Sequence, residues 1–169
     1  FHDGFRLLRW GGWFRRAGMR NVMLDTHQYL IAMEDPLFSG PARRLYLRSR
    51  RLPWLYRMLV GASGIAIRSA ARSIPVLVGE WCVENQWALH SQNRSAAYRQ
   101  VSRLQRAAWD VSAGQIYWSY QLARSAKPGS GEGKPPRDPR NGGNLEAWDL
   151  TRVWRHGWIR ADTSHDDMP

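Results

Sequence analysis

The sequence predicts an α/β fold built around a parallel sheet, because strand-like runs alternate with helical patterns along the chain. Three segments have an apolar or β-branched run next to polar and aromatic residues: 21–33, 72–81 and 114–122. Between them, residues 41–71 and 93–111 carry apolar side chains at intervals of three and four, which is the period of a helix. This alternation is the signature of βα units that share one parallel sheet.

The three strand segments have a common design. In the first, Val22–Leu24 lead into Asp25, Thr26 and His27, and in the second, Val76–Val78 lead into Gly79, Glu80 and Trp81. The third, with the sequence GQIYWSYQL, is rich in β-branched and aromatic residues. Buried parallel strands have such continuous apolar runs, and they present side chains at their carboxyl ends.

The remaining segments are predicted to be helices and one long loop. Residues 41–71 are expected to form two helices that are divided at Leu52–Pro53, because a residue before proline avoids the helical region. Residues 93–111 are expected to form one amphipathic helix, and residues 146–155 a shorter one. Residues 126–144 are rich in Gly and Pro, which predicts a loop. Its GSGEGK stretch is one residue short of a phosphate-binding loop, and Pro135 stands where that motif needs Ser or Thr.

Composition limits the possible classes of protein. At 169 residues, with 43% hydrophobic and 23% charged residues, the chain has the balance of a single folded domain. The lone Cys82 excludes an internal disulfide framework, and the five histidines show no metal-ligand spacing, so neither cofactor nor metal is expected. No apolar run is long enough to span a membrane. Two features are unusual, namely ten tryptophans and a formal charge of +11.

Glu80 is the first candidate for chemistry. It follows an apolar strand and Gly79, which places it at the carboxyl end of that strand, where α/β proteins locate their sites. His27 and Tyr29 are two residues apart, so they share a face on a strand and are expected near Glu80 if the two strands are neighbours. A tyrosine hydroxyl that donates to a carboxylate orients it and favours its charged form. The competing interpretation of Glu80 is an acidic residue that forms a structural ion pair with an arginine. The competing interpretation of His27 and Tyr29 is a pair with a purely structural role.

Five motifs together resemble glycoside hydrolase family 5, and especially its exo-β-1,3-glucanase-like members. They are FHDGF at 1–5, LDTHQY at 24–29, GEW at 79–81 after IPVLV, YWSY at 117–120 and AWDLTRVWRHGWI at 147–159. They occur in the order of the family pattern and cover nearly the whole chain. The resemblance implies a TIM (β/α)8 barrel, of which this chain would supply about strands five to eight.

The resemblance also implies roles for particular residues in a retaining glycosidase. Glu80 matches the catalytic nucleophile, and His27 and Tyr29 match the pair that contacts nucleophile and substrate. The residues matched to substrate binding are Trp118 as the aromatic platform, with Trp81, His2, Asp3 and Phe5 near the cleft. The implied substrate is a β-glucan or a derived oligosaccharide.

The sequence departs from the family pattern in one essential respect. The Asn-Glu-Pro motif that ends strand four and supplies the general acid/base is absent, and neither Glu34 nor Glu84 has that context. Gln121 and the Cys82–Glu84 segment also differ from the glucanase pattern, which leaves the glycan open. We therefore expect a fragment: residues 1–160 as part of a catalytic domain and 161–169 as a polar tail. Alone it is expected to be inactive.

Two other functions stay open at this point. The charge of +11 is compatible with a basic module that binds nucleic acid or another polyanion, but the arginines are scattered over helical segments and no nucleic-acid motif occurs. The other alternative is a catalytically inactive sugar-binding relative. On the glycosidase interpretation we expect a glycan partner, no nucleic acid and no membrane. An extracellular and a cytoplasmic location are both compatible with the sequence.

Overall fold

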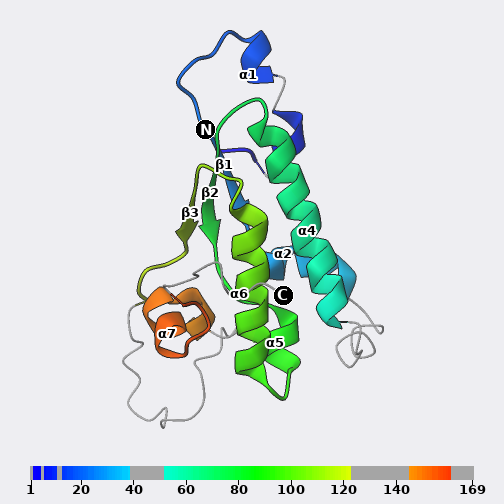
Figure 1. Cartoon of the computed structure of the whole chain (residues 1–169), viewed down its shortest axis with the longest axis vertical. Helices are drawn as coiled ribbons and strands as arrows, with labels where there is room; N and C mark the ends of the chain where they lie inside the picture. Colours follow the sequence, from blue (N-terminus) through cyan, green and yellow to red (C-terminus); the bar gives the residue numbers. More distant parts are fainter. Residues whose placement is uncertain (1, 5, 11–12, 39–51, 123–144, 161–169) are drawn as a thin grey trace.

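The computed structural model describes residues 2–4, 6–10, 13–38, 52–122 and 145–160. As predicted, this part of the chain has an α/β fold in which helices alternate with the strands of a parallel sheet (Figure 1). The sheet has the order β1 (Leu24–Gln28), β2 (Val76–Trp81) and β3 (Gly114–Tyr117). The helical elements are η1 (Leu7–Arg9), α1 (Trp13–Arg16), α2 (Leu30–Phe38), α4 (Leu52–Ala71), α5 (Gln86–His90), α6 (Arg94–Trp109), η2 (Leu145–Trp148) and α7 (Leu150–Arg155).

All strand pairings run parallel, and they follow the order of the chain. β1 pairs with β2 from Leu24 opposite Val76 onward, and β2 pairs with β3 from Leu77 opposite Gly114. On the other side of β1, an isolated parallel bridge joins His2 to Asp25. Within the described residues the sheet remains open and does not close into a barrel.

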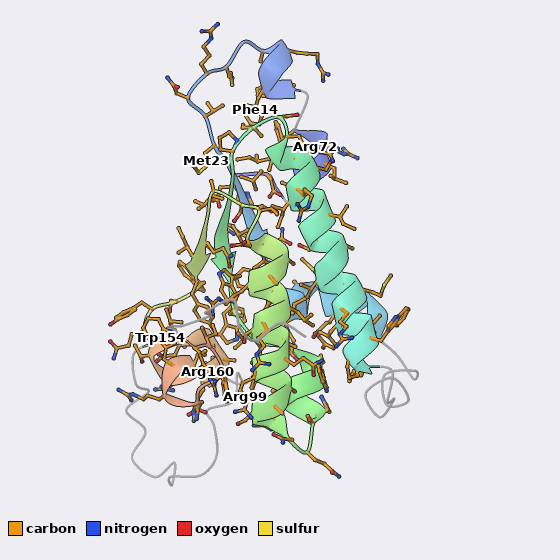
Figure 2. All side chains as sticks on the ribbon, viewed as in Figure 1. Phe14, Met23, Arg72, Arg99, Trp154 and Arg160 are labelled. Carbon is orange, nitrogen blue, oxygen red and sulfur yellow. The ribbon has the colours of Figure 1, made fainter. Side chains whose placement is uncertain are left out.

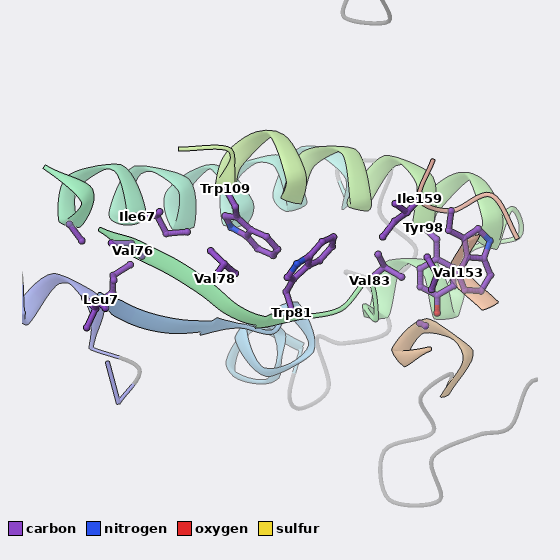
Figure 3. Packing of buried hydrophobic residues seen from close by; sticks show 14 of the residues in the cluster. Leu7, Ile67, Val76, Val78, Trp81, Val83, Tyr98, Trp109, Val153 and Ile159 are labelled. Atoms are coloured by element: carbon purple, nitrogen blue, oxygen red, sulfur yellow. The ribbon is translucent and has the colours of Figure 1, made fainter. Parts of the chain in front are cut away.

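One face of the sheet carries the main hydrophobic core. Val76 and Val78 point toward α4 and α6, where they join Ile67 and Trp109 in a cluster of fully buried side chains (Figure 3). On the opposite face, Ile116 is half exposed and Leu77 is partly exposed. The described sheet is therefore strongly buried on its helical side only, which is unusual because parallel sheets are normally covered on both faces.

The long helix α4 agrees in part with the predicted break at Leu52–Pro53. It begins at Leu52, so Pro53 lies in the first turn, where its missing N–H costs no hydrogen bond. The expected helix before this point falls in 41–51, outside the described residues. Against α6 the helix packs closely at Gly64, where an added Cβ would lie 2.8 Å from the carbonyl oxygen of Ala108.

Side-chain caps fix where α5, α6 and α7 begin. The predicted helix over 93–111 is observed as α6, whose first turn is capped by Asn93 accepting from the backbone N–H of Ala96 at 3.0 Å. Asn85 caps α5 in the same way, and this short helix was not predicted. The expected helix over 146–155 is divided into η2 and α7 at Asp149, and the strand expected within 21–33 ends at Gln28, before α2. The expected loop at 126–144 lies outside the described residues.

Among the described helices, none is long and apolar enough to cross a membrane.

Candidate active site

Glu80 lies near the carboxyl end of β2 and is contacted by two side chains from the β1 side. The Tyr29 hydroxyl donates to Glu80 Oε2 at 2.7 Å, and His27 Nδ1 lies 3.2 Å from the same oxygen. The Glu80 side chain remains 26% exposed. Since both contacts use Oε2, the second oxygen, Oε1, is left without a hydrogen-bond partner among the described residues and is available for chemistry.

The pairing of β1 with β2 brings these residues together. His27 stands directly opposite Glu80 in the register, immediately after an irregularity between Thr26 and His27. Such irregularities change the direction in which a strand presents its side chains. The sequence pattern predicts His27 and Tyr29 near Glu80 if the two strands are neighbours, and the structure places them there.

Tyr29 is held from two sides. Its ring stacks on Trp148 with the ring centroids 5.2 Å apart, while its hydroxyl contacts Glu80. Burial and the hydrogen bond to Glu80 raise the pKa of Tyr29 well above its ordinary value of 10.0. The hydroxyl therefore stays protonated at neutral pH and acts as a donor to the carboxylate. No sequence pattern predicts Trp148 at this site, because it lies more than a hundred residues from Tyr29 in the chain.

Asp25 is a further member of the site, and the sequence motifs did not predict it. Its Oδ2 lies 3.3 Å from His27 Nε2, so His27 stands between two carboxylates. A Cβ added to Gly79 would lie 1.8 Å from Asp25 Oδ1, so any larger residue there would force this carboxylate to move. The available signal was its spacing, because Asp25 and His27 are two residues apart on one strand and share a face.

The residues matched from the opening motif have different surroundings. The His2 ring contacts the His27 ring edge-on at 4.3 Å, which places His2 beside the site. Asp3 is 1% exposed, accepts from the Thr26 hydroxyl at 2.8 Å and receives the Trp10 indole N–H on its backbone oxygen. Asp3 thus supports β1 from within the protein. Phe5 lies outside the described residues.

The two tryptophans matched to substrate binding lie in contrasting environments. Trp118 follows β3 and is 49% exposed, and the peptide bond between Trp118 and Ser119 is cis. Trp81 is 5% exposed and packs edge-on against Trp109 and Tyr117 in the core. The structure therefore places Trp118 on the surface beside the strand that carries Glu80, whereas Trp81 lies on the helical side of the sheet.

Two other carboxylates are buried away from Glu80. Glu34 accepts hydrogen bonds from the Tyr56 hydroxyl and the backbone N–H of Gln86, and Glu84 accepts from Tyr98 at 3.1 Å. Both side chains are at most 1% exposed. Burial raises the pKa of Tyr56 above its ordinary range, so it remains a donor to Glu34. The described residues hold no group of three or more His, Cys, Asp or Glu that could bind a metal ion.

The cluster of Glu80, Tyr29, His27 and Asp25 can orient one carboxylate while leaving one of its oxygens open. Such an arrangement suits a carboxylate that attacks an electrophilic carbon or that exchanges a proton. The sequence matches none of the protein-family models and none of the curated proteins with which it was compared.

Proposed function

We propose that this chain is the carboxyl-terminal part of a (β/α)8-barrel glycosidase that cleaves β-glucosidic bonds in a β-glucan with retention, and that Glu80 is its nucleophile. The observation that carries the proposal is the double contact of Tyr29 and His27 with Glu80 Oε2. The motifs that resemble glycoside hydrolase family 5 include these same three residues. Trp118, half exposed after the neighbouring strand, is the proposed platform for the sugar ring.

In the proposed reaction, Glu80 Oε1 attacks the anomeric carbon of the glucoside. The bond from that carbon to the leaving oxygen breaks, and a general acid protonates the leaving oxygen, which gives a glucosyl ester on Glu80. Water then attacks the same carbon, losing its proton to the same group, and the Glu80 carboxylate leaves. Tyr29 and His27 fix the carboxylate during both steps through Oε2.

The general acid would have to come from a second carboxylate about 5 Å from Glu80. The Asn-Glu-Pro motif that supplies it in the family is absent from the sequence, and the buried Glu34 and Glu84 are engaged by other partners. Among the described residues the sheet is open, with Ile116 exposed on one face and β3 at its edge, and in a barrel both would lie against further strands. Both points favour a partial barrel.

A substrate that needs no general acid tests this proposal on the chain as it exists. We suggest a dinitrophenyl β-glucoside in which fluorine replaces the hydroxyl next to the anomeric carbon. Dinitrophenolate leaves without protonation, and the fluorine slows hydrolysis of the glucosyl ester. We expect a single burst of dinitrophenolate, with at most one equivalent per chain and no later turnover.

The control is Glu80→Gln, which keeps the size of the side chain but removes the nucleophile and should abolish the burst. Laminarin and an unactivated aryl β-glucoside should show no turnover, since they require the general acid. Steady turnover of laminarin would refute the partial barrel. A burst that persists in Glu80→Gln, or no burst at all, would refute the assignment of the nucleophile and favour a sugar-binding relative without catalysis.

A further inference from the structure

The outer face of α4 carries an exposed apolar line that the core does not use. Trp54, Met58 and Ile65 are 61%, 54% and 71% exposed. Met58 and Ile65 follow Trp54 by four and eleven residues. The three side chains therefore fall on nearly one line along the helix, over about 16 Å. The opposite side of α4 is firmly packed, with Tyr56, Val60 and Ile67 at most 1% exposed, so the helix has a fixed orientation.

Two arginines run beside this apolar line. Arg57 is three residues after Trp54 and Arg68 three residues after Ile65, so they repeat on one flank of the line, and both are exposed. None of the ion pairs found among the described residues includes Arg57 or Arg68. α4 itself contains no acidic residue. In the sequence, residues 36–79 hold eight arginines and neither Asp nor Glu.

We propose that this face of α4 binds the surface of an anionic lipid membrane. An apolar line flanked by arginines is the pattern of a helix that lies in the membrane interface, where apolar side chains enter the acyl region and cations face the phosphates. The net charge of +11 adds attraction at longer range. The inference differs from the expectation of no membrane contact, and it does not depend on the glycosidase proposal.

A lipid surface fits this face better than a nucleic acid does. The phosphate backbone of nucleic acid would also attract Arg57 and Arg68, but it offers no apolar layer for Met58 and Ile65. Binding to single strands depends on aromatic side chains on which bases stack, and the exposed line of α4 contains one aromatic residue, Trp54. In Figure 1, α4 runs along the margin of the molecule away from β3, and Figure 2 shows Arg72 just beyond its carboxyl end.

Flotation with lipid vesicles tests the proposal directly. The chain should float with vesicles of phosphatidylcholine that contain phosphatidylglycerol, and should not float with pure phosphatidylcholine. Because each arginine near an anionic surface contributes about a factor of five, the double variant Arg57→Gln/Arg68→Gln should bind roughly 25-fold more weakly. The triple variant Trp54→Ser/Met58→Ser/Ile65→Ser should lose at least about tenfold through its lost apolar burial.

A matched control uses exposed apolar residues elsewhere on the surface. Trp154 and Met19 are 46% and 47% exposed, and Trp154→Ser/Met19→Ser should bind vesicles like the original chain. Circular dichroism checks that all the variants are folded. If the triple variant unfolds, the vesicle binding of Arg57→Gln/Arg68→Gln still tests the proposal. The proposal is overturned if anionic vesicles do not bind the chain, or if the triple variant binds them unchanged. It is also overturned if the chain binds duplex DNA more tightly than the vesicles and the triple substitution leaves the binding of DNA unchanged.

Discussion

At the scale of single residues, Gly79 shows how the backbone makes room for the candidate site. An added Cβ would lie 1.8 Å from Asp25 Oδ1, so we expect Gly79→Ala to lower the free energy of unfolding by about 1–3 kcal/mol. Urea unfolding measures this change. Gly61→Ala is the control, since nothing lies within 4 Å of its added Cβ, and it should be neutral or stabilising by about 0.5–1 kcal/mol.

The partner in this steric conflict can be identified with a double variant. Asp25→Ala removes the carboxylate, so Gly79→Ala should cost much less in the Asp25→Ala background than in the original chain. Equal costs in both backgrounds would contradict the close contact between Gly79 and Asp25.

Tyr29 allows a prediction about chemistry at the same scale. Tyr29→Phe removes the 2.7 Å hydrogen bond to Glu80 but keeps the ring that stacks on Trp148. Hydrogen bonds to charged groups contribute about 1.5–3 kcal/mol, so the burst rate with the activated fluoroglucoside should fall at least about tenfold. The control is Tyr120→Phe, because Tyr120 is 66% exposed. An unchanged burst rate in Tyr29→Phe would exclude the proposed role of Tyr29.

Within the candidate site, the sequence predicted that His27 and Tyr29 lie near Glu80, but not that Trp148 and Asp25 contact them. His27, Tyr29 and Glu80 could be assigned because strand ends of a parallel sheet meet at one edge. Trp148 could not be placed beside Tyr29, because no local pattern encodes a stacking contact between such distant segments. Trp81 shows the limit of motif matching, since a residue next to Glu80 in sequence lies on the other side of the sheet, among core side chains.

At the scale of elements, Asp149 determines where α7 begins. Its carboxylate accepts from the Thr151 hydroxyl and from the backbone N–H groups of Arg152 and Leu122. Burial by itself would raise the pKa of Asp149, but these hydrogen bonds and the charge of Arg152 outweigh it and lower the pKa below its ordinary value of 3.8. The charged form is therefore the one that stabilises the fold.

The sign of the resulting pH dependence follows from the direction of this shift. Because the pKa is lower in the folded state, the stabilisation is fully present above 3.8 and is lost as the pH falls through the lower folded value. Asp149→Ala should cost about 0.5–2 kcal/mol at neutral pH, and the cost should shrink in acid. Thermal unfolding at several pH values measures this, with the exposed Asp110→Ala as control. A cost that is constant with pH would contradict the account.

The sequence predicted the existence and order of the main elements better than their ends. The period of apolar residues was sufficient for α6, and the apolar run at Val76–Val78 was sufficient for β2. Short elements such as α1 and α5 were missed because four or five residues are too few for a periodic pattern to appear. The division at Asp149 depends on a capping side chain whose partners, such as Leu122, come from another segment.

At the scale of the whole molecule, the open face of the sheet has consequences for association. Ile116 is 50% exposed on β3, which is an edge strand in the described sheet, and such edges readily pair with other chains. We expect the isolated chain to self-associate as its concentration rises. Ile116→Lys should reduce this association, as measured by sedimentation, because a charge on an edge opposes pairing. Met19→Lys, at another exposed apolar position, should leave the association unchanged, and equal effects of the two substitutions would argue against this edge.

The class of fold could be predicted from the sequence, whereas the extent of the sheet could not. Strand and helix periods establish the alternation, and the described residues confirm it as a parallel α/β fold. In a barrel, further chain segments would cover the face around Leu77 and Ile116. The barrel therefore stays a prediction that is based on the motifs.

The residue that carries the sugar can be located on the protein after reaction with the activated fluoroglucoside. Peptide mapping by tandem mass spectrometry identifies the residue that carries the glucosyl ester. We expect the ester on Glu80, formed once per chain, and no ester on the Glu80→Gln variant. An ester on Asp25 or on any other carboxylate, or an unmodified chain after prolonged exposure, would contradict this expectation.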